Sequence, residues 1–465
     1  MNPILPLYYA APDVEAHVWK NDPNTVYLYC SNDRIDGGGM APYQNCFSSR
    51  DLIHWKDHGI AFDARSAVTW TQVDTLPAVD AIYHKGKWYY FFTAPVDGYL
   101  MQCVASSDRP EGPFTDPVPI FGTEYPSCGD PSVLEDDDGS VYLFWGQFNL
   151  RGGKLTDNMH ELIPETVRTM ILTEEEHGFH EGASIRKRNN TYYLLYADIS
   201  RGKPTCLSYA TSKSPLGPYV KGGVIIDNAK CDLASWNNHG SMLCFHDRWY
   251  IVYHRATLAR EMGGRRVCLE PIQFDENGGI REVIMTTQGV DGPISATEWM
   301  DAYRACEFEF GRDQKKIEAE WKPFFIHFPL SGWNKNMKEY FLKNSKDDGV
   351  RSAHKVQKDH NSEYLTRFSD GDAAIYRYLR FDGTETKFCC EAASVDAQTD
   401  LEIRIDSYDG PLIGICRVDH SGGWEDWKHY ETTIQKTEGV HALYLVARDG
   451  GNGSRLCNLN RFRFE

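Results

Sequence analysis

The chain of 465 residues lacks long apolar runs and any excess of positive charge. No stretch approaches the roughly 18 consecutive apolar residues of a transmembrane helix, so we expect no membrane span. Asp and Glu number 66 against 49 Lys and Arg, which gives a net charge of −17. Nucleic acids and anionic membranes require a basic surface, so neither is expected as a partner.

Cysteines in CxxC spacing are also missing, and we expect no leader segment. The 13 cysteines form no CxxC pair, and only Cys389 and Cys390 are adjacent. An odd count without paired spacing favours small buried side chains in a reducing compartment over a complete disulfide framework. The N-terminus, MNPILPLYYAAPD, has no basic region followed by a long apolar run, so we expect no signal peptide.

Helical periodicity is nearly absent from the first ~290 residues, where one short phrase recurs instead. Five times a polar turn is followed by an apolar and aromatic strand, centred on Tyr27, Trp88, Tyr142, Tyr192 and Trp249. The steps between these positions are 61, 54, 50 and 57 residues. A period of this length, with several short strands per unit, is typical of propeller blades. The sequence therefore predicts a five-bladed β-propeller.

A titratable side chain stands about ten residues before each recurrence. These side chains are Asp13, Asp80, Asp130, Glu181 and His239. Equivalent positions of propeller blades surround one axis, so we expect the five to converge. A lone Asp in a loop is usually a turn cap. Acids that meet at an axis repel one another, which a fold tolerates mainly where function uses their coupled pKa values or where they bind a cation.

The pattern changes around residues 293–316 and becomes β-rich again after it. We expect the propeller to occupy residues 1–300, a junction to span 301–316 and a second domain to fill 317–465. Strands are predicted at 374–381, 401–407, 412–418 and 441–447, separated by Gly and Asp turns. Their alternation and spacing indicate a β-sandwich (jelly-roll). The predicted fold class is therefore all-β.

Three carboxylates at one axis suit the cleavage of a glycosidic bond. That reaction needs one carboxylic acid to protonate the leaving oxygen and one carboxylate to activate water or attack the anomeric carbon. A third carboxylate beside the acid raises its pKa by repulsion between like charges. The residues alone do not assign these roles among Asp13, Asp130 and Glu181.

The contexts of these acids resemble glycoside hydrolase family 43, whose catalytic domain is a five-bladed β-propeller. PDVEAHVW is similar to the family's first-blade motif and implies that Asp13 is the general base. GDPSVLEDDDGSVYLFWG is similar to the third-blade motif and implies that Asp130 modulates the pKa of the acid. HEGASIRKRNNTYYLLY is similar to the motif of the general acid, which implies that role for Glu181.

The same resemblance implies further site residues. AVDAIYHKGKWYYFF resembles the second-blade motif and implies that Asp80 lines the substrate site, to which we also assign Trp70. GRRVCLEPI resembles the segment whose arginine holds sugar hydroxyls, which implies that role for Arg265. NNHGSM implies that His239 lies near the axis, where many members bind calcium; a hydrogen-bonded core histidine is the alternative.

The C-terminal segment resembles a carbohydrate-binding module of family 6. SGGWEDWKHY and the closing segment that contains NLNRFRFE imply that Trp424 or Trp427 stacks on a sugar face and that Asn458 binds a hydroxyl. KIEAEWKPF resembles the opening of that module and implies a structural calcium site at Glu318 and Glu320.

Together these features predict an inverting, exo-acting glycosidase. It would remove terminal xylose or arabinofuranose from plant cell-wall (arabino)xylan or arabinan fragments, as a β-xylosidase or α-L-arabinofuranosidase. An endo-arabinanase, an exo-galactanase or a non-hydrolytic carbohydrate-binding protein are the alternatives. No cofactor is expected for the chemistry, and Ca²⁺ would be structural. Cysteine use favours the cytoplasm and a binding module favours secretion, so localisation stays open.

Overall fold

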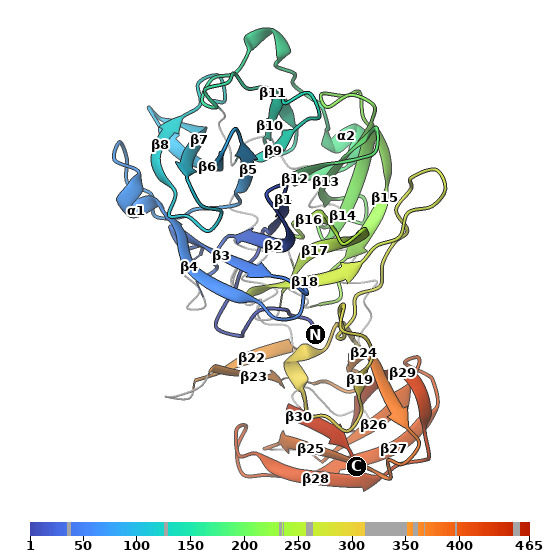
Figure 1. Cartoon of the computed structure of the whole chain (residues 1–465). Helices are drawn as coiled ribbons and strands as arrows, with labels where there is room; N and C mark the ends of the chain where they lie inside the picture. The colour runs from blue at the N-terminus through green and yellow to red at the C-terminus, as the bar shows by residue number, and fades with distance from the viewer. Residues whose placement is uncertain are drawn as a thin grey trace.

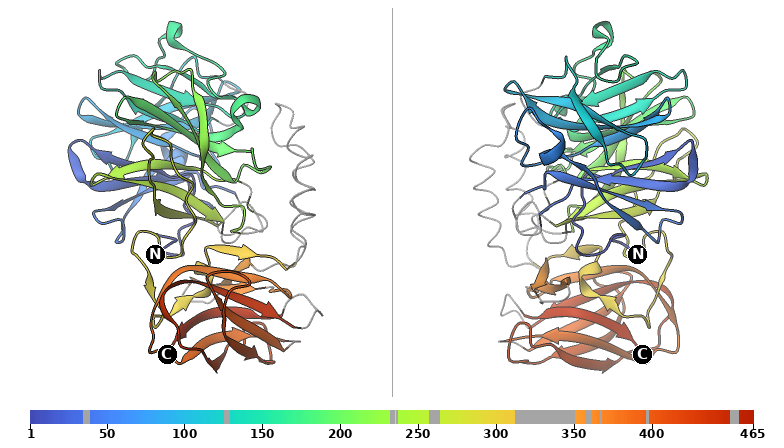
Figure 2. Two further views of the ribbon diagram at one scale, coloured as in Figure 1. Left: turned by 90° about the vertical axis from the view of Figure 1, so that its right-hand side faces the viewer. Right: turned by 60° about the vertical axis from the view of Figure 1, so that its left-hand side comes forward.

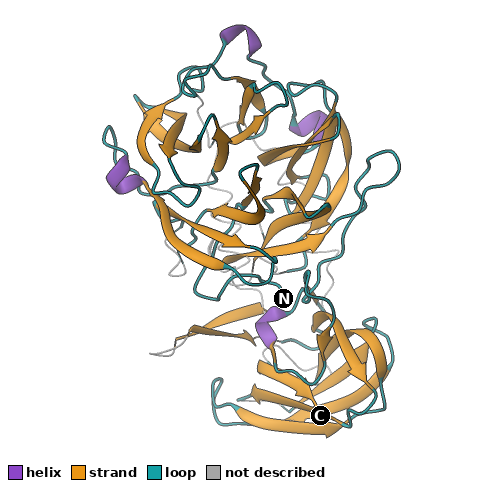
Figure 3. Ribbon diagram, viewed as in Figure 1, coloured by secondary structure: helices purple, strands orange, loops and turns teal. Residues whose placement is uncertain are grey.

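The computed structural model shows a protein built almost entirely of strands (Figure 3). It describes residues 1–34, 39–124, 129–231, 235, 237–256, 264–311, 351–356, 361–366, 368–395, 398–449 and 456–465. The helices among these residues are single turns: α1 (Ala64–Ala67), η1 (Pro164–Thr166), α2 (Glu174–His177) and η2 (Ala302–Arg304). None of them has the length and apolar character needed to span a bilayer.

Five antiparallel sheets, each formed by strands that follow one another in the chain, surround one axis (Figure 1). The first two sheets comprise β1 (Glu15–Trp19), β2 (Asp22–Cys30), β3 (Tyr43–Ser49) and β4 (Lys56–Asp63), then β5 (Asp80–His84), β6 (Lys87–Val96), β7 (Tyr99–Ser107) and β8 (Thr115–Pro119). The third comprises β9 (Ser132–Glu135), β10 (Val141–Trp145) and β11 (Arg151–Lys154). The last two comprise β12 (Phe179–Arg188), β13 (Thr191–Asp198), β14 (Cys206–Ser212) and β15 (Val220–Asp227), then β16 (Gly240–Phe245), β17 (Arg248–Ala256) and β18 (Arg265–Pro271). The predicted five-bladed propeller is confirmed.

The recurring phrase of the sequence forms the second strand of every blade, which is β2, β6, β10, β13 and β17. These strands are apolar because they are covered on both faces; Leu194 and Leu195 of β13 are both fully buried. The first strands of the blades, β1, β5, β9, β12 and β16, contact one another in a closed ring. The residues that precede or open these first strands therefore meet at the axis.

The N-terminal residues close the fifth blade, which has only three strands of its own. The backbone N–H of Ile4 donates to the carbonyl of Val267 in β18 over 3.0 Å. The fully buried amide of Asn2 donates to the side chain of Glu270 and accepts from the backbone N–H of Leu269, both at 2.9 Å. The first residues thus take the place of a fourth strand along β18.

The second domain is a β-sandwich of two six-stranded sheets (Figure 1). One sheet contains β19 (Ile294–Ser295), β21 (Glu307–Glu309), β24 (Ala373–Asp382), β26 (Thr399–Ile405), β27 (Leu412–Val418) and β29 (Glu438–Arg448). The other contains β20 (Met300–Asp301), β22 (Arg351–Val356), β23 (Asn361–Thr366), β25 (Lys387–Ala393), β28 (Lys428–Thr433) and β30 (Asn458–Phe464). In β26 every second residue is buried, as Leu401 and Ile403 are, which is the alternation expected of a strand with one face in a core.

The boundary predicted at residue 300 is wrong, because the sandwich begins earlier. β19 pairs in parallel with β24, β20 pairs with β30, and β21 pairs with β24. The segment 294–309 thus belongs to both sheets of the sandwich instead of forming the end of the propeller and a junction. These pieces of two or three residues are too short to show a strand period in the sequence.

The two domains share a continuous apolar interface, and both views of Figure 2 show the sandwich against one side of the propeller. One buried cluster includes Tyr193 and Ile251 of the propeller together with Ile375 and Tyr444 of the sandwich. An ion pair between Arg266 and Glu363, each with 1% of its side chain exposed, also crosses this interface. The sandwich is therefore packed firmly on the propeller.

Candidate active site

The predicted axial residues lie at the inner ends of the first strands of the blades. Asp13 stands two residues before β1, Asp130 two residues before β9, and His239 directly before β16. Glu181 lies in β12, and Asp80 is the first residue of β5. Asp13 and Asp130 have φ values of 55° and 26°. Non-glycine residues rarely adopt such conformations, and those that do are concentrated at functional sites.

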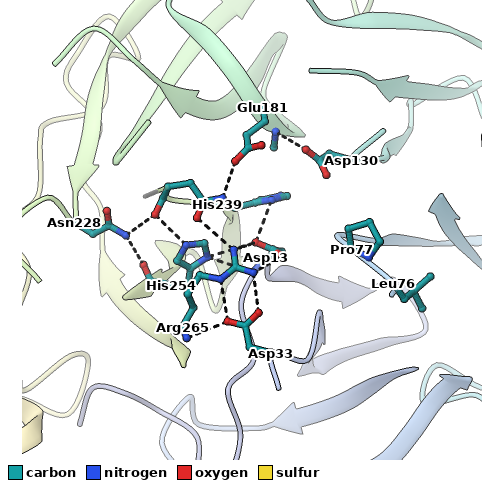
Figure 4. Close-up of polar contacts among 12 residues, drawn as sticks. Asp13, Asp33, Leu76, Pro77, Asp130, Glu181, Asn228, His239, His254 and Arg265 are labelled. Carbon is teal, nitrogen blue, oxygen red and sulfur yellow. Dashed lines mark hydrogen bonds and ion pairs between the residues drawn. The ribbon is translucent and has the colours of Figure 1, made fainter. Parts of the chain in front are cut away.

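The carboxylate of Asp13 is buried among cationic and imidazole groups (Figure 4). Its Oδ1 atom accepts from Nη1 of Arg265 at 3.0 Å and lies 3.6 Å from Nδ1 of both His239 and His254. Burial alone would raise the pKa of Asp13, but the positive charge of Arg265 more than offsets it, so the pKa lies below its ordinary value. Asp13 is therefore ionised at neutral pH.

The two histidines beside Asp13 are neutral. Burial lowers the pKa of His239, and burial together with the Arg265 charge lowers that of His254 to about 3. The backbone N–H of Asp13 donates to Nδ1 of His254 at 3.4 Å, and Nε2 of His254 lies 3.1 Å from the carbonyl of Asn237. This arrangement places the proton of His254 on Nε2, because Nδ1 accepts.

Arg265 is held by Asp33, a residue that the sequence did not single out. Nε and Nη2 of the guanidinium donate to the two carboxylate oxygens of Asp33 at 3.0 and 2.9 Å. The remaining nitrogen, Nη1, faces Asp13 and the side-chain oxygen of Asn237, which lies at 3.3 Å. Arg265 lies at the site as predicted, but its N–H groups donate to protein oxygens. It therefore positions the side chains of Asp13 and Asn237.

Glu181 is only partly buried, and both of its carboxyl oxygens accept from side-chain amides. Nδ2 of Asn237 donates to Oε1 and Nε2 of Gln147 donates to Oε2, each over 2.7 Å. Figure 4 shows Glu181 on the opposite side of the network from Asp33. The carboxyl group is therefore fixed in orientation while its residue remains partly accessible.

Asp130 is linked to Glu181 through the backbone. Its Oδ2 atom accepts from the N–H of Gly182, the next residue after Glu181, at 3.2 Å. Gly182 has a φ of 65°, and a Cβ atom at that position would lie 2.9 Å from Nδ1 of His239. Glycine is thus required both for the backbone conformation and for the close approach of the histidine ring.

The assignment of Asp80 to substrate binding is not supported by its surroundings. The residue is fully buried, and its carboxylate accepts from the backbone N–H of Val133 at 2.8 Å and lies 2.6 Å from Nε2 of His17. Glu15 lies in the same buried group, and burial together with the Asp80 charge raises its pKa to about 8. The second blade therefore contributes a structural carboxylate that joins the inner strands.

The described residues do not fit a calcium ion at His239. Two groups of three His, Cys, Asp or Glu side chains lie close enough to share a metal, Cys389 with His429 and Glu431 and Glu15 with His17 and Asp80, and His239 is in neither group. The carboxylate of Asp13, 3.6 Å from its ring, is already bound by a guanidinium, which repels a divalent cation. His239 here is a buried neutral side chain of the site.

Family models match both domains of this chain. The model described as glycosyl hydrolases family 43 matches residues 1–280, and that of the carbohydrate binding module (family 6) matches residues 343–465. The chain belongs to glycosyl hydrolase family 43. The predicted resemblance is confirmed, and the protein is a glycoside hydrolase.

Relatives of this family 43 enzyme match it over nearly its whole length. A xylosidase/arabinosidase of Thermoclostridium stercorarium is 27% identical, covering 97% of this chain and 97% of the relative. An arabinoxylan arabinofuranohydrolase of Bacillus subtilis is 26% identical, covering 94% and 86%. A solved family 43 β-xylosidase/α-arabinofuranosidase from a compost microbial metagenome, in complex with xylotriose and in a calcium-free form, is 27% identical with a TM-score of 0.52, covering 61% of this chain and 97% of that one.

The residues assigned to the binding module lie together, with one of them in a structural role. Asn458 is buried, and its amide donates to the backbone carbonyl of Trp424 at 2.6 Å. The ring of Trp427 packs edge-on against Tyr364 with centroids 5.1 Å apart, and both Trp424 and Trp427 are partly exposed. Asn458 thus holds the loop of Trp424 in place, and stacking of Trp424 or Trp427 on a sugar stays a prediction.

The remaining predicted site residues are Trp70, assigned to the substrate site, and Glu318 and Glu320. Trp70 is 36% exposed and donates from its indole nitrogen to the carbonyl of Pro95 at 3.1 Å, so one edge of the ring is tethered to β6. Glu318 and Glu320, assigned to a calcium site of the module, lie outside the described residues.

Sequence reasoning missed Asp33, Asn237, Gln147 and His254. Asn237 stands two residues before His239 in the same NNHGSM stretch, so proximity in sequence was a usable signal. Asp33 and Gln147 follow the second strands of the first and third blades, at positions to which the repeat assigns no function. Only the folded structure shows that Asp33 and Gln147 contact Arg265 and Glu181.

Proposed function

We propose that this family 43 enzyme is an exo-acting, inverting glycosidase that removes terminal xylose or arabinofuranose from arabinoxylan or arabinan fragments. The observation that carries the proposal is the pair of carboxyl groups at the axis, Asp13 and Glu181. They differ in environment as a base and an acid should: Asp13 is buried beside Arg265 with a lowered pKa, and Glu181 is partly exposed between neutral amides.

In the proposed reaction Asp13 accepts a proton from a water molecule as the water oxygen attacks the anomeric carbon. Glu181 gives its proton to the glycosidic oxygen, the bond from that oxygen to the anomeric carbon breaks, and the leaving sugar departs as an alcohol. Solvent then reprotonates Glu181 and takes the proton from Asp13. An inverting enzyme keeps its two carboxyl groups about 6.5–9.5 Å apart so that water fits between sugar and base.

The choice of sugar rests on the names of the relatives. Those that align over almost the whole chain are named xylosidase/arabinosidase and arabinoxylan arabinofuranohydrolase. A solved structure 27% identical to the chain was determined with xylotriose. A C-terminal module of a carbohydrate-binding family suits an enzyme that acts on polymer fragments.

The test is the release of 4-nitrophenol from its β-xyloside and α-L-arabinofuranoside, followed by product analysis on arabinoxylan, arabinan and xylo-oligosaccharides. Exo action gives a monosaccharide as the first product, and endo action gives shorter oligosaccharides. NMR of the first-formed anomer tests inversion. Binding of the polysaccharides without turnover of any substrate would identify a non-hydrolytic binding protein and overturn the proposal.

A further inference from the structure

The amide of Asn237 connects the two halves of the site. Its Oδ1 atom accepts from Nη1 of Arg265 at 3.3 Å, and its Nδ2 atom donates to Oε1 of Glu181 at 2.7 Å. Nη1 of Arg265 also donates to Asp13 at 3.0 Å. A continuous chain of hydrogen bonds therefore runs from Asp13 through Arg265 and Asn237 to Glu181.

The orientation of this amide follows from the chemistry of its neighbour. A guanidinium carries only donors, so the atom of Asn237 that faces Arg265 must be the oxygen. The NH₂ group then has to face Glu181. Arg265 cannot turn away to relax this constraint, because the carboxylate of Asp33 holds Nε and Nη2 at 3.0 and 2.9 Å.

The backbone of Asn237 is held as firmly as its side chain. Its carbonyl oxygen accepts from Nδ2 of Asn228 at 3.0 Å and lies 3.1 Å from Nε2 of His254. Asn228 is fully buried, and its amide also donates to the backbone carbonyl of His254 at 3.0 Å. Hydrogen bonds thus hold both the backbone carbonyl and the side-chain amide of Asn237.

We propose that Asn237 is a positioning residue for the general acid: together with Gln147, whose Nε2 donates to Oε2 at 2.7 Å, it fixes the orientation of the Glu181 carboxyl group by donating to Oε1. The N–H donor of Asn237 binds an ionised carboxylate more strongly than a protonated carboxylic acid. This inference rests on the proposed glycosidase function.

The test compares Asn237→Ala with wild type on two substrates of the sugar that wild type cleaves best. A disaccharide has a poor leaving group and needs protonation by Glu181, whereas a 2,4-dinitrophenyl glycoside does not. We expect kcat to fall by about 100-fold on the disaccharide and by less than about 5-fold on the dinitrophenyl glycoside. The basic limb of the pH profile should move to higher pH, because a donor to the ionised form is lost.

Asn237→Asp provides a variant of nearly the same shape that can still accept from Arg265. It places a carboxylate against Glu181, so the basic limb should move further toward high pH than in Asn237→Ala. Asn238→Ala is the matched control, since Asn238 is buried in the same loop but donates to the carbonyl of Thr205 at 3.1 Å. The control should keep the substrate dependence and the pH profile of wild type.

Equal losses on both substrates together with an unmoved basic limb would overturn the positioning role while leaving the glycosidase function intact. A wild-type protein that cleaves neither substrate would overturn the proposed function, and this inference with it. The two failures are therefore distinguished by the activity of wild type.

Discussion

Nη1 of Arg265 lies 3.0 Å from Oδ1 of Asp13, and the two side chains come from the fifth and the first blade. The contact thus spans the place where the ring of blades closes. It keeps a buried carboxylate ionised, because the charge of Arg265 opposes the cost of burial. The geometry of the base therefore depends on correct closure of the propeller.

Removal of this charge should change the acid limb of the pH profile. In Arg265→Gln no positive charge beside Asp13 opposes the effect of its burial, so the pKa of Asp13 should rise and activity should be lost at a higher pH on acidification. We expect a shift of roughly one to three pH units, measured as kcat/KM against pH. Arg201→Gln, which removes an exposed partner of Glu282, serves as the control and should leave the limb in place.

Glu181→Gln should abolish turnover of natural glycosides while the fold remains intact. The amide cannot donate the acidic proton, and general acid catalysis contributes on the order of 100-fold or more. The measurement is kcat on xylo-oligosaccharides or arabino-oligosaccharides, with circular dichroism to verify folding. Rates close to wild type would show that another group is the acid.

Asp130→Asn should move the basic limb of the pH profile to lower pH. The substitution preserves an acceptor for the N–H of Gly182 but removes a negative charge from the neighbourhood of Glu181. Without like-charge repulsion the acid loses its proton more readily. An unchanged basic limb in kcat/KM would contradict the modulating role.

Asn2→Ala should destabilise the protein, because Asn2 closes the fifth blade. The substitution leaves the carboxylate of Glu270 and the backbone N–H of Leu269 without this partner in a buried place. We expect a loss of about 1–3 kcal/mol in the free energy of unfolding, measured by urea denaturation. The exposed Asn24→Ala is the control, and an equal effect of both would argue against closure by the N-terminus.

Glu270→Gln should stabilise the protein at alkaline pH. Burial raises the pKa of Glu270 to about 8, so the folded state binds a proton more tightly than the unfolded state, whose pKa is near 4.5. The contribution of the protonated carboxyl to stability is complete below pH 4.5 and is lost as pH rises toward 8. The variant should therefore gain on the order of 5 kcal/mol over wild type at pH 9 and little at pH 4. A constant difference across this range would contradict the raised pKa.

The sequence by itself determined the blades and the candidate acids. A strand needs only a local pattern. The repeated aromatic phrase marks the second strand of each blade, which is β2, β6, β10, β13 and β17. Because each acid stands roughly ten residues before that phrase, the repeat predicts its place at the axis.

Only the tertiary structure decided what each axial residue contacts. Asp80 and Glu181 occupy equivalent positions of the repeat, yet one is fully buried and the other is partly exposed, because neighbouring blades cover them differently. Asp33 and Arg265 are 232 residues apart, and no local pattern signals a contact over that distance. The hydrogen bonds that orient the two catalytic candidates are of this long-range kind, so they arise only when the ring of blades closes.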